Sequence, residues 1–331
     1  MLKGQGMTIS EMVAFAQRAE EQGYESVWVP EFWRECFVPL AAIAMRTSRI
    51  RVAAGVALAY PRSAALMAQT VANIDELSEG RFIFGLGTGA PDTNDLWYDV
   101  GDQSRPLTKL KDVAEIVRRI LAASQGDVVS FQGQEARTEH FPLTFQPLRP
   151  DVPLYLGSIK PRSIETAGAM ADGVLTGAML SLPWLEQVAE PRLHAGAVGA
   201  GRSADEVDLA SLVTCCVADD PDEARAMARA EVATYLPFES IRTVYEVSGF
   251  SEAREVAAEA FHRHDSETVL AQVTDEMVDT LTVCGTPDQC REKLEALRQY
   301  VQLPVLIPAA AGLTAAQVRR NTERLLETFS A

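Results

Sequence analysis

Short apolar segments alternate with amphipathic segments along most of the chain, and this alternation limits the possible folds more than any other feature. The apolar segments predict strands, and a predicted helix follows each of them. Strict alternation of this kind predicts a parallel sheet. About seven strands are clear, and a stub at Met1–Lys3 makes eight units, which favours a (β/α)8 TIM barrel over a doubly wound sheet. The clear strands lie at 26–30, 51–56, 82–84, 152–157, 174–177, 207–217 and 303–308.

Three departures from the regular pattern are expected. An irregular stretch at 126–150 indicates an insertion before strand 5. A charged helical stretch at 236–283, with no clear strand, indicates a helical insertion before strand 8. The first strand is short or truncated, and an upstream start of the chain is one explanation of its length. Neither a composition break nor a Gly/Ser-rich linker interrupts the sequence, which predicts one domain over residues 1–331.

The charge and the cysteines of the chain exclude several classes of protein. A formal net charge of −16 disfavours nucleic acid or an anionic membrane as the main partner. The five cysteines are odd in number and form no C-x-x-C motif, which favours reduced thiols over a disulfide framework or a zinc site. The sequence has no signal-peptide pattern and no apolar run of about 18 residues, so we expect a soluble cytoplasmic protein.

A glycine-rich turn follows the third clear strand. Gly85, Gly87 and Ala90 fit the dinucleotide-binding pattern G-x-G-x-x-A. Two observations argue against that motif. Residues 91–95 stand where its helix should run, with the next helical pattern only near Pro106, and no acidic residue ends a following strand about 20 residues later. A strand-to-loop turn in an active site fits better, and a purely structural turn is the alternative.

In a barrel, the catalytic residues lie where the strands end. The expected strand ends carry glycines, aromatic rings and hydroxyl groups, but neither a set of metal ligands nor a Ser/His/Asp or Cys/His arrangement. Such a site has little acid–base chemistry of its own and suits a flat cofactor that supplies the chemistry. The strand-end residues are Glu31, Phe32, Trp33, Gly55, Val56, Tyr60, Gly87, Thr88, Gly89, Gly157, Ser158, Lys160, Arg162, Thr176 and Gly177.

Charged residues at these positions have competing interpretations. Lys160 and Arg162 lie at a predicted helix N-terminus, where they either bind an anion or are simply solvated. Glu31 either contacts a cofactor or substrate, or forms an ion pair at the rim of the barrel. His262 and His264 are two residues apart in a helical segment, so a solvated face is favoured over a metal site.

Several motifs together resemble the bacterial luciferase-like superfamily (LLM class) of flavin- or coenzyme F420-dependent (β/α)8 oxidoreductases. The resemblance covers nearly the whole chain. The segment Gly157-Ser-Ile-Lys-Pro-Arg, with Asp172-Gly173 downstream, is similar to the methylenetetrahydromethanopterin reductase branch, which uses coenzyme F420. The other motifs are Ser26-Val-Trp-Val-Pro-Glu-Phe, Gly55-Val56 with Tyr60-Pro61-Arg62, and Gly85-Leu-Gly-Thr-Gly-Ala.

This resemblance implies roles for particular residues. Gly55-Val56 would be the counterpart of a non-prolyl cis peptide whose bulge supports the deazaflavin ring. Glu31 and Phe32 would be the catalytic pair, with Glu31 near the ring. Phe32 departs from the pattern of the relatives, which carry histidine at that position. Cofactor contacts are also implied for Gly87, for Thr88 and Gly89 at the ring or ribityl chain, and for Gly157, Ser158, Lys160 and Arg162 at the phosphate.

We therefore expect a coenzyme F420-dependent oxidoreductase that transfers a hydride between the deazaflavin and a small organic substrate. One alternative is an FMN-dependent monooxygenase that uses reduced flavin and O2, and another is a non-catalytic cofactor-binding barrel. An aldolase or isomerase barrel is disfavoured, because the strand ends lack a Schiff-base lysine and paired carboxylates. The resemblance also implies a homodimer, and the substrate cannot be deduced from the variable loops.

Overall fold

The computed structural model describes residues 1–3, 6–32 and 34–330. It divides the chain into two compact units, which are described separately. One unit comprises residues 2–157, and the other comprises Met1 with residues 158–331. Among the described residues, no helix is long and apolar enough to cross a membrane.

In the unit of residues 2–157, the strands β1, β2, β4 and β7 pair in that order and are all parallel. The short β3 pairs with the C-terminal end of β4. Strand β4 is buried at every position, as the run of apolar residues predicts. The stub at Met1–Lys3 is not a strand, but the Leu2 amide donates to the carbonyl oxygen of Trp28 at 2.9 Å. The strands are β1 (Ser26–Val29), β2 (Arg51–Ala54), β3 (Ala57–Leu58), β4 (Phe82–Gly87) and β7 (Leu154–Gly157).

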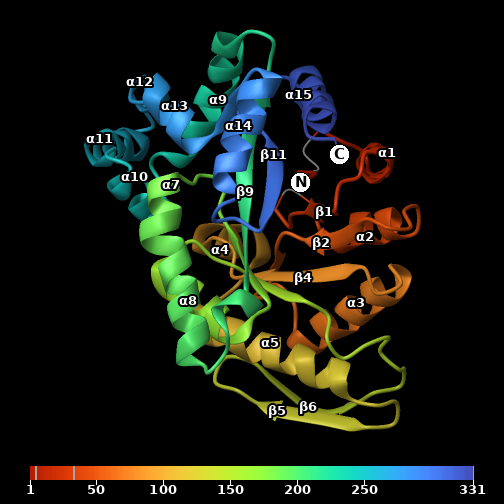
Figure 1. Ribbon diagram of the computed structural model, residues 1–331. Coiled ribbons are helices and arrows are strands. Elements are labelled where there is room, and N and C mark those ends of the chain that lie inside the picture. The colour runs from red at the N-terminus through yellow and green to blue at the C-terminus, as the bar shows by residue number, and fades with distance from the viewer. Residues whose placement is uncertain (4–5, 33, 331) are drawn as a thin grey trace. The chain divides into compact units, whose positions relative to one another are not determined.

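Helices follow the strands of this unit as the alternating pattern predicts, with one exception. Thr8 and Glu11 form a capping box at the start of the first helix. An antiparallel hairpin of β5 and β6 lies beside α5 (Figure 1). The buried carboxylate of Asp112 in α5 ties the hairpin to the helix by accepting from the amides of Glu135 (2.6 Å) and Ala136 (3.1 Å). The elements are α1 (Ile9–Glu21), α2 (Phe37–Ala44), α3 (Ala64–Leu77), α4 (Pro91–Tyr98), α5 (Pro106–Ala122), β5 (Val128–Gln132) and β6 (Arg137–Pro142).

The exception is α4, since the prediction that no helix runs between the glycine-rich turn and Pro106 is wrong. Pro91 occupies the first turn of α4, a position that proline favours. The helix is held by a buried side chain, because Asn94 donates to the Thr88 carbonyl oxygen and to Oε1 of Gln103, each at 2.7 Å. Asn94 is the buried residue of this eight-residue helix, so the sequence shows no periodic apolar pattern there.

In the unit of residues 158–331, the long strand β9 is the centre of the sheet. It pairs in parallel with β8 near its start, with β11 along Ala210–Cys215, and with β10 along Cys215–Val217. Strand β10 falls at the end of the stretch that was expected to contain no strand; it has three residues and is too short to show a pattern. The strands are β8 (Gly173–Thr176), β9 (Asp208–Val217), β10 (Val283–Gly285) and β11 (Leu303–Pro308).

Helices surround these strands, and residues 236–281 are mainly helical, as predicted. Gly168 of α6 and Gly196 of α8 allow a close approach of the two helices, because a Cβ at either position would overlap a backbone carbonyl oxygen of the other helix. All five cysteines are buried, and none of them forms a disulfide in the structure. The helices are α6 (Pro161–Met170), α7 (Leu182–Trp184), the π-helix Leu185–Ala189, α8 (Glu190–Gly199), the 3-10 turn Ala204–Glu206, α9 (Pro221–Tyr235), the 3-10 turn Glu239–Ile241, α10 (Arg242–Val247), α11 (Ser251–His262), α12 (Ser266–Ala271), α13 (Asp275–Leu281), α14 (Pro287–Leu297) and α15 (Ala315–Thr328).

Candidate active site

A bulge segment, residues 55–58, follows strand β2 and interrupts the sheet edge where strands end. The peptide bond between Gly55 and Val56 is cis, which confirms the geometry that the resemblance implies. The Gly55 amide donates to the carbonyl oxygen of Val29 at 2.9 Å, so the segment starts in register with β1. It then rejoins the sheet as β3, which pairs with Leu86 and Gly87 of β4.

Three glycines of the neighbouring strands make room for the side chain of Val56. A Cβ on Gly87 would overlap Cγ2 of Val56. A Cβ on Gly157 would lie 3.0 Å from Cγ1, and one on Gly85 would lie 3.2 Å from Cγ1 while overlapping the carbonyl oxygen of Ala54. The first role of the glycines in this turn is therefore to leave space for the bulge segment. Contacts of Gly87 and Gly157 with a cofactor stay a prediction.

Glu31 is buried directly beside the bulge segment, with 6% of its surface exposed. One carboxylate oxygen accepts from the Leu58 amide at 2.8 Å, and the other forms an ion pair with Arg62. The Glu31 amide donates to the carbonyl oxygen of Val56 at 3.3 Å. Of the two interpretations of Glu31, the structure contains the ion pair, and its partner Arg62 was not predicted as a site residue.

The same carboxylate belongs to a group that resembles a metal site. Ligand atoms of Glu31, Glu35 and Cys36 lie within 4.8 Å of one another. Arg62 already supplies a cation here, because it pairs with both carboxylates. Burial, followed by the charges of Glu31 and Glu35, raises the pKa of the Cys36 thiol, so the thiolate that a metal prefers is disfavoured. Arg62 accounts for this cluster without a metal ion.

An aromatic pair lies beside these residues at the end of β1. Phe32 is 41% exposed, and its ring centroid lies 5.3 Å from that of Trp97 in α4. Phe32 has no proton to donate. Tyr98, the next residue of α4, has a hydroxyl group whose pKa is raised by burial and then by the charge of Glu31, so it stays protonated at neutral pH. Sequence reasoning missed Trp97 and Tyr98, because it did not recognise α4.

Thr88 and Gly89 follow strand β4; Thr88 is half-buried, and Gly89 is exposed with a positive φ of 71°. The Thr88 hydroxyl donates to the Gly89 carbonyl oxygen at 3.3 Å. Gly89 lies against the buried Asn94, whose Oδ1 atom has no hydrogen-bond partner in the described part of the chain. A buried acceptor without a protein partner is uncommon and calls for an explanation, such as a bound water or ligand.

In the unit of residues 158–331, Ser158, Lys160 and Arg162 lie at the N-terminus of α6. The Ser158 amide donates to the Leu175 carbonyl oxygen at 3.0 Å, but its buried Oγ has no partner among the described residues. Lys160 is the N-cap residue and makes no capping hydrogen bond through its side chain. Lys160 and Arg162 are exposed. Free amides, an unsatisfied hydroxyl and two cations at one helix terminus suit an anion.

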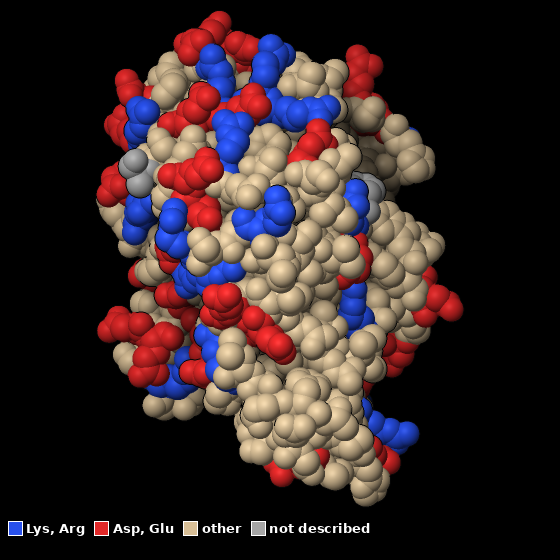
Figure 2. Space-filling model, turned by 90° about the vertical axis from the view of Figure 1, so that its right-hand side faces the viewer, with Lys and Arg blue, Asp and Glu red and all other residues tan. Residues whose placement is uncertain are grey.

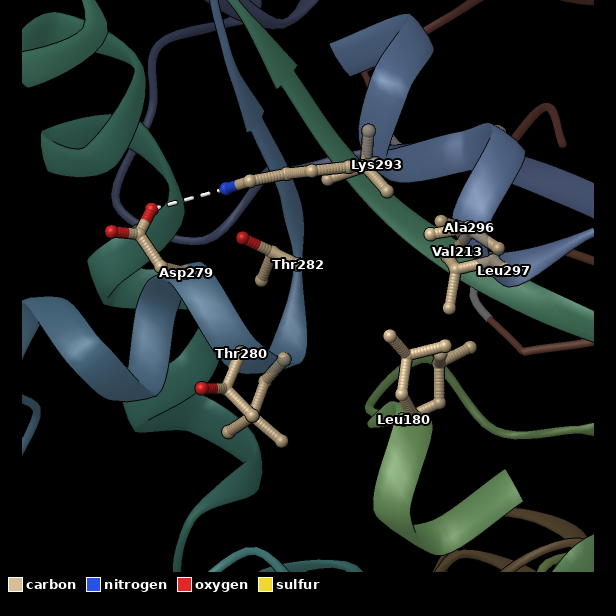
Figure 3. Close-up of a pocket in the computed structure, with 11 residues that line it drawn as sticks. Leu180, Val213, Asp279, Thr280, Thr282, Lys293, Ala296 and Leu297 are labelled. Carbon is tan, nitrogen blue, oxygen red and sulfur yellow. Dashed lines mark hydrogen bonds and ion pairs between the residues drawn. The ribbon is translucent and has the colours of Figure 1, made fainter. Parts of the chain in front are cut away.

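A separate cavity of about 100 Å³ lies in the same unit and contains none of the predicted site residues (Figure 3). Leu180, Val213 and Leu297 form its apolar side. On its polar side, Lys293 donates to Asp279 at 3.1 Å. These charged groups satisfy each other, so they do not indicate a ligand.

Comparison with known proteins defines the family. The model of the luciferase-like monooxygenase family matches residues 1–302. The sequence is 34% identical to a 5,10-methylenetetrahydromethanopterin reductase of Methanolobus tindarius, over 86% of this chain and 85% of the relative. For the reductase of the same name from Archaeoglobus fulgidus, the identity is 31% over 88% of this chain and 87% of the relative.

A solved structure agrees with these relatives. The chain is similar to the coenzyme F420-dependent tetrahydromethanopterin reductase of Methanopyrus kandleri, with a TM-score of 0.82, 25% identity, and coverage of 98% of this chain and 95% of that one. This similarity confirms the predicted luciferase-like α/β barrel class and supports an enzyme of the coenzyme F420-dependent oxidoreductase class. The chain belongs to the luciferase-like monooxygenase family.

Proposed function

We propose that this protein is a coenzyme F420-dependent oxidoreductase that transfers a hydride between the deazaflavin and a small organic substrate. The observation that carries the proposal is the sequence similarity to methylenetetrahydromethanopterin reductases along most of both chains. When bound, coenzyme F420 supplies the hydride chemistry at C5 of its deazaflavin ring. The residues of this chain then have to bind and orient the cofactor and the substrate and to exclude water.

The bulge segment and the end of β4 fit the ring and ribityl part of such a cofactor. Gly55 and Val56 present backbone and a half-buried isopropyl group, and Thr88 adds an accessible hydroxyl. The unsatisfied Oδ1 atom of Asn94 behind Gly89 supports a ligand with a hydrogen-bond donor. We propose that these residues contact the cofactor, and that Phe32 and Trp97 limit the access of water to it.

The N-terminus of α6 fits the phosphate of the cofactor. A chain with a net charge of −16 needs a local cationic site to bind an anion. Lys160 and Arg162 supply two cations, and the buried Oγ of Ser158 supplies a hydroxyl without a partner in the described part of the chain. We propose that these three residues, with the backbone at Gly157, bind the phosphate.

Equilibrium fluorescence titrations with coenzyme F420 and with FMN test this proposal. Selective binding of coenzyme F420, followed by turnover with a hydride donor or acceptor, would support it. Selective binding of FMN with O2 consumption would replace it by the monooxygenase activity after which the family is named. Tight binding of coenzyme F420 without turnover of any substrate would favour a non-catalytic cofactor-binding protein.

We also propose a homodimer. Helix α2 carries no charged residue, and Val38 and Met45 at its two ends are 62% and 63% exposed. Leu66 and Leu77 of the neighbouring α3 are exposed as well. Figure 2 looks onto the side on which α2 and α3 lie in Figure 1, and a broad area there has no charged side chains. Sedimentation equilibrium should give twice the chain mass for the wild type and a lower mass for Val38→Glu.

A single domain over residues 1–331 stays a proposal too. The similarity to the reductase structure along nearly the whole chain supports it. A single cooperative unfolding transition, seen equally by fluorescence and by circular dichroism, is the expected result. Two separate transitions would contradict it.

A further inference from the structure

Arg62 is a half-buried charged residue that the proposed cofactor contacts do not include. It follows β3, and only 17% of its side chain is exposed. Its guanidinium forms an ion pair with Glu31 and a second, at 3.3 Å, with Glu35. The guanidinium also lies over the ring of Phe37, 5.1 Å from its centroid. An arginine held on three sides in this way is fixed in position.

Glu31 connects Arg62 to the bulge segment through backbone hydrogen bonds. Its amide donates to the carbonyl oxygen of Val56, and its carboxylate accepts from the amide of Leu58. Glu31, which follows the C-terminal end of β1, therefore binds the backbone on both sides of Ala57. The Leu58 amide is buried, so without the carboxylate it would lose a hydrogen bond that water cannot easily replace.

The charge of Arg62 is needed because the carboxylate beside the bulge segment is buried. Removing one partner of a buried ion pair leaves an uncompensated charge, which costs far more than replacing both partners by neutral groups. Without Arg62, Glu31 would turn toward water and release the Leu58 amide. The position of the bulge segment thus depends on Arg62, which acts on it through Glu31.

We infer that Arg62 and Glu31 are positioning residues, which hold the bulge segment in the shape that the ligand meets, and that Glu31 is not the group that donates a proton in the reaction. This inference deepens the proposed function, on which its ligand-binding part rests. Its structural part concerns the cofactor-free protein. The two parts can therefore fail separately.

Hydrogen exchange of the cofactor-free protein, read at the Leu58 amide by mass spectrometry, is the main test. Arg62→Met should speed exchange at Leu58 by about tenfold, while exchange in β4 stays unchanged. Arg62→Lys keeps the charge and should restore most of the protection. In the double variant Glu31→Gln/Arg62→Met no buried charge is left unpaired, so its exchange at Leu58 should be slower than in Arg62→Met alone.

Glu35→Gln is the matched control, because Glu35 shares the contact to Arg62 but caps α2 through the amides of Phe37 (2.6 Å) and Val38 (2.9 Å). This variant should speed exchange at those two amides and leave Leu58 unchanged. Coenzyme F420 binding should weaken by about tenfold in Arg62→Met, recover in part in the double variant, and change less than about twofold in Glu35→Gln.

Unchanged exchange at Leu58 in Arg62→Met would overturn the inference, as would faster exchange spread evenly over β4. Altered exchange at Leu58 combined with unchanged affinity for coenzyme F420 would overturn the link to the ligand. If the wild type binds no coenzyme F420, the proposed function fails. The exchange data still decide the positioning role in that case.

Discussion

A methyl group added to Gly87 overlaps Cγ2 of Val56, whereas it would lie 3.5 Å from Cβ of the same residue, an ordinary contact distance. The clash is therefore with the Cγ2 methyl group of the valine and not with its Cβ. Forcing an extra carbon into a packed contact of this kind costs about 1–3 kcal/mol. Val56 is fixed by its neighbours on both sides, so we expect Gly87→Ala to lower the free energy of unfolding by about 2 kcal/mol.

Val56→Ala should remove the clash. The single variant loses two methyl groups from a half-buried position, which costs about 1 kcal/mol. Adding Gly87→Ala to it should cost less than about 0.5 kcal/mol, so the two substitutions should show a coupling energy of about 1.5–2 kcal/mol. Gly157→Ala, with contacts of 3.0 and 3.1 Å to the two branches, should behave in the same way with a smaller effect.

Gly85→Ala is the matched control for this cycle. Its methyl group overlaps the carbonyl oxygen of Ala54, which is backbone, so Val56→Ala should not rescue it. Urea unfolding of the cofactor-free variants measures all of these free energies. Additive effects of Gly87→Ala and Val56→Ala, or rescue of Gly85→Ala, would refute the account of why the glycines are there.

Three further predictions concern charge and burial. Lys160→Ala should weaken coenzyme F420 binding by about three- to tenfold in a titration at low salt, with less effect at high salt, while Lys111→Ala, which removes an exposed lysine of α5, should not. Burial and then the charge of Glu231 raise the pKa of Tyr235 to about 12. The unfolded chain therefore loses this proton first, and the free energy of unfolding should fall as the pH rises above about 10. Tyr235→Phe should reduce that fall by up to about 2 kcal/mol in unfolding experiments. Arg149→Met should cost about 3–5 kcal/mol in urea unfolding, because it leaves the carboxylate of Asp75, 1% exposed, without its bidentate partner, and a loss below about 1 kcal/mol would contradict this.

The sequence predicted the parts of the fold that repeat. Buried strands such as β4 carry continuous apolar runs, and amphipathic helices such as α5 carry long periodic patterns. The capping box at Thr8 marks a helix start by local chemistry. Helix α4 and strand β10 were missed, since they are short and are held by tertiary contacts. The first rests on the buried Asn94 rather than on an apolar face.

The candidate site was predicted in its positions but not in its contacts. The cis bond at Gly55 came from the resemblance to a family, because no local pattern predicts it. That Gly85 and Gly87 accommodate the Val56 side chain of the bulge segment depends on strand register, which the sequence does not show. The ion pair of Arg62 with Glu31 joins residues 31 positions apart, and many other acidic residues were equally plausible partners.

Hydrogen exchange of the wild-type protein with and without coenzyme F420 tests the central claim most directly. Residues 55–59 and 158–163 include most of the proposed contacts, so both segments should exchange more slowly when the cofactor is bound. The cavity lining at 280–283 and the hairpin of β5 and β6 should not change. Protection of both segments at saturating coenzyme F420, and not with FMN, is the predicted result. Binding that leaves residues 55–59 unprotected, or that protects 280–283 instead, would contradict the account.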